Sequence, residues 1–128
     1  MTVDAFENPD RYSCFAMFHI HEADSFVSKI CERKIELRDT AVLFAMMATC
    51  NHKTGKVKFV AKALAKRLNI TETNLSASIK RLKKEFLIAL ILEPNGEKYY
   101  IINPYLFSVG RKQKWGHLLS LFTKAINE

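Results

Sequence analysis

Residues 70–86 (ITETNLSASIKRLKKEF) combine small hydrogen-bonding side chains with a cluster of cations. If the segment is a helix, its apolar positions share one face and are expected in the core: Leu75, Ile79, Leu82 and Phe86. The outward side then carries a polar and cationic set: Thr73, Asn74, Ser76, Ala77, Lys80, Arg81 and Lys84. Hydroxyls and amides bond base edges and phosphates, a small alanine allows close approach, and cations neutralise phosphate. The segment therefore predicts a surface that contacts double-stranded nucleic acid.

Positive charge is concentrated in the middle third of the chain. The 128 residues carry a formal net charge of +7, and residues 51–84 alone hold ten basic residues and one acid. A local field of this sign raises the concentration of polyanions near the surface. Nucleic acid is the first partner that this charge favours, and an anionic membrane is the second. A solvated lysine-rich face is the alternative that requires no partner.

The residues before this segment predict a shorter helix and a tight turn. Residues 61–69 (AKALAKRLN) have a helical pattern, and Asn69 suits its C-terminal end. Three residues of this helix are expected to face inward: Ala63, Leu64 and Leu68. Thr71 is expected to cap the next helix, with Glu72 at its positive end, and Thr71 is also a candidate nucleic-acid contact. Two helices joined by a turn of about three residues make a helix-turn-helix, in which Lys62 is a further candidate phosphate contact.

Upstream segments are expected to complete the core. Residues 39–51 predict a helix that begins near Asp39 or Thr40 and is apolar on nearly all sides. Such a helix is either central or shared with a second subunit. Residues 14–21 have a short strand pattern, 56–60 predict a very short strand, and 25–35 fit a helix or a strand equally.

Residues 87–104 predict a β-hairpin and residues 111–128 a final helix. Two β-rich runs flank EPNGEK, where Asn95 and Gly96 tolerate positive φ, and Lys98 beside the tip is a candidate contact to the nucleic-acid backbone. The final helix is amphipathic, with apolar residues at Trp115, Leu118, Leu119, Phe122 and Ile126 and an interruption at Gly116.

The order of these elements is that of a winged helix-turn-helix domain, an α+β fold that is mainly α with a small β-hairpin. We expect one domain over residues 1–128, with an N-terminal extension (1–35), a winged helix core (36–104) and a C-terminal amphipathic helix (105–128). In such domains the third helix lies in the major groove with its N-terminal residues toward the bases.

Other residues give no basis for catalysis or for a metal or cofactor site. His19 and His21 can share one side of a strand, but a zinc site needs a third ligand. Cys14, Cys31 and Cys50 form no CxxC pair, and reduced thiols are expected. The four glycines include no phosphate-cradling loop. We therefore expect no enzyme activity, no metal and no cofactor.

The N-terminus has no signal-peptide pattern, and no apolar run reaches membrane-spanning length. These features predict a cytoplasmic protein with no membrane partner. The all-round apolar helix over residues 39–51 and the C-terminal apolar stripe together predict a homodimer. Dimers of winged helix domains contact two half-sites about one helical turn apart.

One known family resembles this chain over roughly residues 25–110. The segment FVAKALAKRLNITETNLSASIKRLKKEFLI, followed by YYIINPYLFSVG, is similar to plasmid replication initiators of the RepL type and their phage relatives. Its most distinctive part is the INP-x-L-F-x-x-G run over residues 102–110. The chain departs from the family at Phe86, where glycine often precedes the apolar LI pair. The resemblance implies recognition of double-stranded DNA at a replication origin, with host replication proteins as possible partners.

The expected function is thus sequence-specific binding of double-stranded DNA through residues 71–84. A transcriptional repressor on the same fold is the alternative within DNA binding. A protein-interaction module that uses the basic face on an acidic partner is the alternative of another class.

Overall fold

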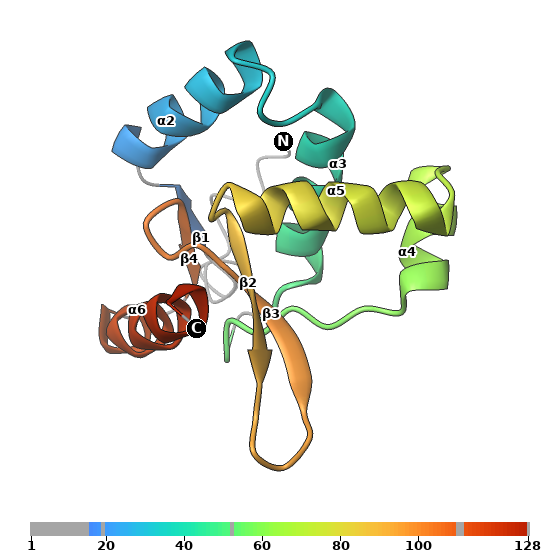
Figure 1. Cartoon of the computed structure of the whole chain (residues 1–128). Coiled ribbons are helices and arrows are strands. Elements are labelled where there is room, and N and C mark those ends of the chain that lie inside the picture. The colour runs from blue at the N-terminus through green and yellow to red at the C-terminus, as the bar shows by residue number, and fades with distance from the viewer. Residues whose placement is uncertain (1–15, 19, 52, 110–111, 128) are drawn as a thin grey trace, which may run out of the picture.

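The computed structural model describes residues 16–18, 20–51, 53–109 and 112–127. Along this part of the chain the elements are β1 (Ala16–Phe18), α2 (Ile20–Cys31), α3 (Leu37–Thr49), α4 (Ala61–Leu68), α5 (Glu72–Lys84), β2 (Ile88–Leu92), β3 (Lys98–Ile102), β4 (Phe107–Val109) and α6 (Lys112–Ile126). Figure 1 shows α5 lying across α3, with the β2–β3 hairpin projecting away from the helices.

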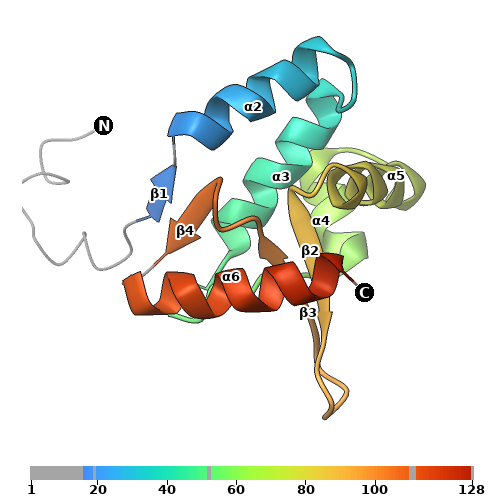
Figure 2. The same cartoon turned by 60° about the vertical axis from the view of Figure 1, so that its left-hand side comes forward.

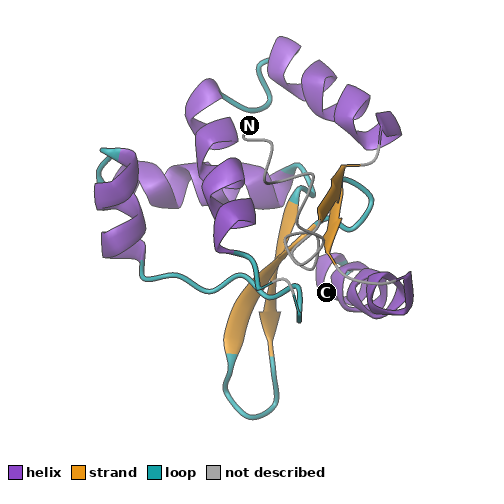
Figure 3. Ribbon diagram, turned by 180° about the vertical axis from the view of Figure 1, so that it is seen from behind, coloured by secondary structure: helices purple, strands orange, loops and turns teal. Residues whose placement is uncertain are grey.

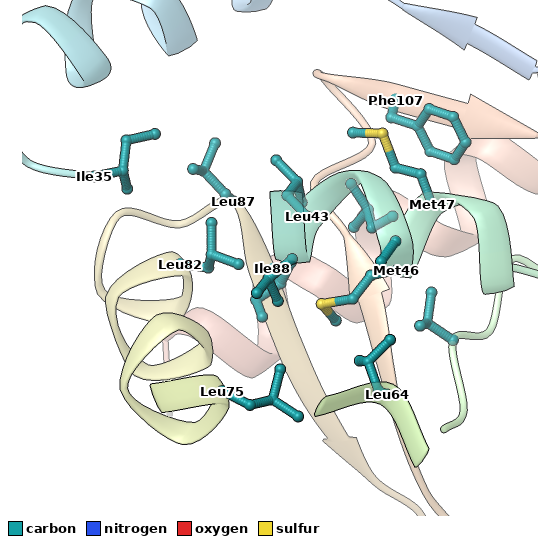
Figure 4. Close-up of a cluster of buried hydrophobic side chains, with 14 of the residues drawn as sticks. Ile35, Leu43, Met46, Met47, Leu64, Leu75, Leu82, Leu87, Ile88 and Phe107 are labelled. Atoms are coloured by element: carbon teal, nitrogen blue, oxygen red, sulfur yellow. The ribbon is translucent and has the colours of Figure 1, made fainter. Parts of the chain in front are cut away.

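The helices surround a core in which α3 is the central element. α3 packs against both α4 and α5 (Figure 3). Figure 4 shows Leu75 and Leu82 of α5 beside Met46 of α3 and Ile88 of β2, and all four side chains are at most 1% exposed. The predicted core positions Leu75 and Leu82 are therefore confirmed, while Ile79 is only partly buried at the edge of this cluster.

α3 begins at Leu37, two residues earlier than predicted, and ends at Thr49. Its N-cap residue is Glu36, and the Glu36 backbone N–H donates to Asp39 Oδ2 over 2.8 Å. Asp39 therefore supports the helix start from the third helical position and is not the cap residue itself.

The hairpin has a packed core on both of its faces. β2 and β3 pair antiparallel with Leu90 opposite Tyr100, and Val57 adds a single bridge to Tyr100. Ile88 faces the helices, whereas Ala89 and Ile91 pack against Phe122 of α6. Figure 2 shows α6 crossing the sheet on that second side. The predicted hairpin is confirmed, and the short strand expected near residue 57 is reduced to this one bridge.

The order α3, single bridge, α4, α5, β2, β3 is a winged helix-turn-helix, as predicted. Two short strands outside this unit, β1 and β4, pair with each other. The pairing is antiparallel, with Phe18 opposite Phe107. The segment left open over residues 25–35 belongs mostly to the helix α2, whose Phe26 and Ile30 pack against the main core. The strand β4 was not predicted.

Two predicted core positions are wrong. Phe86 is 54% exposed because α5 ends at Lys84, so the helical face no longer continues to residue 86. Ala63 is exposed, and Ala65 is buried in α4 instead. In the predicted apolar stripe of α6, Leu118 and Phe122 are buried and Ile126 is 38% exposed, and Leu121 and Ala125 also pack against the sheet. α6 also continues through Gly116 without interruption.

The end of α5 forms a Schellman turn around Phe86. The Leu87 N–H donates to the Leu82 carbonyl over 3.0 Å, and the Phe86 N–H donates to the Lys83 carbonyl over 3.1 Å. Phe86 has φ 59°, the left-handed conformation in which glycine is favoured. The position where the chain departs from the RepL-type pattern is therefore one where glycine has a physical advantage.

Candidate nucleic-acid interface

The turn between α4 and α5 has the predicted chemistry. Asn69 ends α4 with φ 57° and ψ 45°. Two residues later Thr71 caps α5, and its Oγ1 accepts from the Asn74 backbone N–H over 3.1 Å. Thr71 is exposed, but this bond commits its oxygen to the helix start. Glu72 lies in the first turn of α5, where a carboxylate is favoured by the helix dipole.

The outward side of α5 is polar at its N-terminal half and cationic at its C-terminal half. Five of its side chains are exposed: Thr73, Ser76, Lys80, Lys83 and Lys84. Asn74 and Ala77 are half-buried at the margin of this side. We call the five exposed residues, without Asn74 and Ala77, the outer face of α5. In Figure 1 α5 lies on the near side of α3. The exposed residues lie on the side of α5 opposite to its buried residues Leu75, Ser78 and Leu82.

Lys83 is a residue of the outer face that the sequence analysis missed. On a helical wheel of about 100° per residue, Lys83 lies about 40° from Ile79 and about 60° from Phe86, at the margin of the expected core face. The actual core contact is centred on Leu75, Ser78 and Leu82, the three buried residues of α5, and Lys83 is left exposed. Its place in the run KRLKK was the available signal.

Arg81 does not lie on the outward cationic side, contrary to the prediction. Its guanidinium binds the Asp39 carboxylate through two bonds, Nε to Oδ2 at 2.7 Å and a terminal nitrogen to Oδ1 at 2.9 Å. Asp39 is fully buried, and the Arg81 side chain is 30% exposed. The buried carboxylate on α3 holds the Arg81 side chain inward. Arg81 is therefore not available as a phosphate contact.

The carboxylate of Asp39 remains ionised because several donors surround it. Burial acts to raise the pKa of Asp39, but hydrogen bonds involving Arg81, the Glu36 backbone and Ser78, with the charge of Arg81, lower the pKa overall. The same pairing, led by the hydrogen bond to Asp39, raises the pKa of Arg81.

α4 adds three exposed cations beside α5: Lys62, Lys66 and Arg67. Within the described residues, neither these three nor Lys80, Lys83 and Lys84 have a carboxylate within ion-pair distance. Six cations on two adjacent helices are therefore available to an external anion.

One acid of the wing, Glu97, pairs with two lysines of the neighbouring segment, and the other, Glu93, accepts a hydrogen bond from the Tyr99 hydroxyl. Glu97 Oε1 lies 2.9 Å from Lys56 Nζ and 3.0 Å from Lys58 Nζ. Hydrogen bonds from Lys56 and then Lys58 lower the pKa of Glu97. Gly96 at the tip has φ 89°, as its turn requires, and Lys98 is exposed at the start of β3.

A polar hollow of about 450 Å³ lies beside the wing, lined by Thr49, Asn51, Thr54, Lys56, Lys58 and Glu97. Over the described residues, no group of three or more metal-ligating side chains is present. His19 lies outside the described residues, and the placement of the His21 side chain is not described either. No helix in the described part of the chain has the length and apolar character needed to cross a bilayer.

Comparisons with known proteins give little that bears on this interface. No family model matches the chain, and no curated protein matches it. One solved structure with a similar arrangement is a mutant of MepR from S. aureus, at 17% identity and a TM-score of 0.41, covering 84% of this chain and 70% of that chain. A likeness this low does not indicate what the chain binds. The resemblance to RepL-type initiators stays a prediction.

Proposed function

We propose that this protein binds double-stranded DNA with α5 in the major groove. The observation that carries the proposal is the outer face of α5, where three lysines without carboxylate partners among the described residues follow small polar side chains. Phosphate neutralisation by such lysines supplies essentially all of the affinity of non-specific DNA binding.

The polarity of α5 suits this docking. Thr73 and Ser76, which are exposed near the N-terminus of α5, would reach base edges, with Asn74 and Ala77 at the margin. Lys80, Lys83 and Lys84 would contact phosphates along one strand, and the cations of α4, including Lys62, would extend the contact. Lys98 would add one contact from the wing, whose other nearby lysines are paired with Glu97.

A salt titration on a random duplex tests this proposal. The wild-type protein should bind with a log–log salt slope that steepens by roughly 0.9 for each phosphate neutralised. Replacing Lys80, Lys83 and Lys84 together by glutamine should flatten the slope by roughly 2–3 and weaken binding to all sequences. Lys34→Gln is the matched control, because Lys34 already pairs with Glu32 at 3.1 Å. An unchanged slope in the triple variant, or no binding of the wild type at low salt, would contradict the proposal.

We further propose a replication origin as the target, on the resemblance of residues 25–110 to RepL-type initiators. The same geometry also suits a repressor at an operator. Deleting the gene should abolish maintenance of its replicon if the protein initiates replication, and should change only transcription if the protein is a repressor. Host replication proteins are partners only in the first case.

A homodimer is also part of the proposal. Leu37 at the start of α3 is 79% exposed and Val27 of α2 is 54% exposed, and a second subunit would remove apolar side chains of this kind from water. Selection of bound duplexes from a random pool should then yield a two-fold symmetric site. Sedimentation should give twice the monomer mass.

A further inference from the structure

We propose that the Arg81–Asp39 pair is a positioning device that fixes the rotation of α5 about its axis, and that Arg81 contributes to DNA recognition without contacting DNA. This inference rests on the proposed function. It replaces the phosphate contact expected from sequence with a different role for the same residue.

The pair has the geometry of a clamp. Both nitrogens of the guanidinium fork engage both oxygens of one carboxylate, at 2.7 and 2.9 Å, which fixes the direction as well as the distance of the contact. Asp39 itself is held from behind, because the Glu36 backbone N–H donates to Oδ2 over 2.8 Å. The carboxylate is thus part of the first turn of α3 and cannot follow a movement of α5.

A second tie lies one turn away on the same side of α5. Arg38 Nε donates to the Oγ of Ser78 over 3.2 Å, and Ser78 is fully buried. Glu36 Oε2 lies 3.5 Å from Arg81 and 3.8 Å from Arg38, so it links the two arginines. Two ties at successive turns oppose rotation and sliding more directly than the non-directional packing of Leu75 and Leu82 does.

Rotation of α5 decides which side chains can reach the bases. In a helix, neighbouring positions differ by about 100° in direction, so a modest rotation moves Thr73 and Ser76 away from base edges. The lysines at the C-terminal half have long flexible stems and reach phosphates over a range of rotations. Loss of the clamp should therefore weaken discrimination between sequences more than affinity for DNA in general.

The salt dependence of DNA binding distinguishes a positioning role of Arg81 from a phosphate contact. Asp39 already compensates Arg81 within the protein. A charge-neutral double variant, Arg81→Gln with Asp39→Asn, removes the clamp without changing net charge. It should leave the salt slope unchanged, whereas Lys84→Gln should flatten the slope by roughly 0.9 and leave discrimination intact.

The experiment uses a duplex selected from a random pool by the wild type and a scrambled duplex of the same length. Affinities for both are measured at several salt concentrations for the wild type, the double variant and Lys84→Gln. For the double variant we expect the cognate-to-scrambled affinity ratio to fall at least fivefold at constant slope. Arg81→Lys, which keeps the charge but not the fork, should lose a smaller part of the ratio.

Phe122→Ala controls for stability, because Phe122 packs in α6 against the far side of the sheet. At a temperature where all variants are folded, this control should keep the wild-type ratio. A double variant with an unchanged ratio, or with a slope flattened by roughly 0.9, would overturn the inference. Failure of the wild type to select any duplex from the random pool would refute the proposed function itself, which distinguishes the two failures.

Discussion

Asp39 is a fully buried carboxylate on α3 that binds Arg81 of α5 from the core side. A buried charge is tolerated only when it is paired and hydrogen-bonded, and Asp39 receives both arms of the Arg81 guanidinium and a backbone N–H. At the scale of single residues, this carboxylate joins the start of α3 to the last turns of α5. Its ionisation state should therefore be visible in stability.

Asp39→Asn should lower the free energy of unfolding at pH 7 by about 2–3 kcal/mol, between the values for exposed and for fully buried pairs. Because the folded-state pKa of Asp39 is lowered, its stabilisation is complete above the unfolded pKa of about 3.9 and is lost as pH falls through the folded-state pKa. The difference in the free energy of unfolding between the wild type and Asp39→Asn should thus become smaller below about pH 4. Urea unfolding from pH 7 to pH 2.5 measures this, and a difference constant over that range would contradict it.

Phe86 shows how the end of one helix can be improved. At φ 59° a side chain costs about 1–2 kcal/mol that glycine avoids, and the Phe86 ring is half-exposed. Phe86→Gly should therefore raise the free energy of unfolding by roughly 0.5–1 kcal/mol, after the greater chain entropy of glycine is counted. Phe86→Ala is the control, because it removes the ring but keeps the backbone cost. Thermal unfolding should rank glycine above phenylalanine, and an equal gain in the alanine variant would show that backbone strain is not the cause.

The charge of Glu97 in the wing is compensated by two lysines of the segment that adjoins it. Glu97 forms ion pairs with both Lys56 and Lys58. Among the described lysines of residues 56–58 and of the hairpin, only Lys98 has no carboxylate partner. Glu97→Gln should release two cations and steepen the salt slope of duplex binding if the wing reaches the DNA backbone. Anisotropy titrations measure the slope, with Glu32→Gln as the control on the α2–α3 turn. An unaltered slope would place the wing away from DNA.

How far sequence predicts each element depends on how local its causes are. The Asn69 turn, the Thr71 cap and the Asn95–Gly96 tip are set by residues close in sequence, and all three appear as expected. The inward turn of Arg81 depends on Asp39, 42 residues away, which a helical wheel of one segment does not contain. The strand β4 likewise depends on β1 at the other end of the chain.

At the scale of the whole molecule, the cations fall into two groups, those that are paired with carboxylates of the protein and those that are not. The cations of α4 and of the outer face of α5 have no carboxylate partners in the described part of the chain, while Arg81, Lys56 and Lys58 are neutralised from within. The net charge of +7 therefore understates the field on the side of α5 and overstates it elsewhere. A field of this kind attracts and orients a polyanion before specific contacts form.

Lysine reactivity in the presence of duplex DNA tests the central claim most directly. The rate at which an amine-reactive reagent acetylates each lysine can be followed by mass spectrometry, with and without a saturating duplex at low salt. We predict strong protection of Lys80, Lys83 and Lys84 on α5, with Lys34 unchanged at the α2–α3 turn. Equal reactivity of the three α5 lysines with and without DNA, or protection centred on Lys34, would contradict the account.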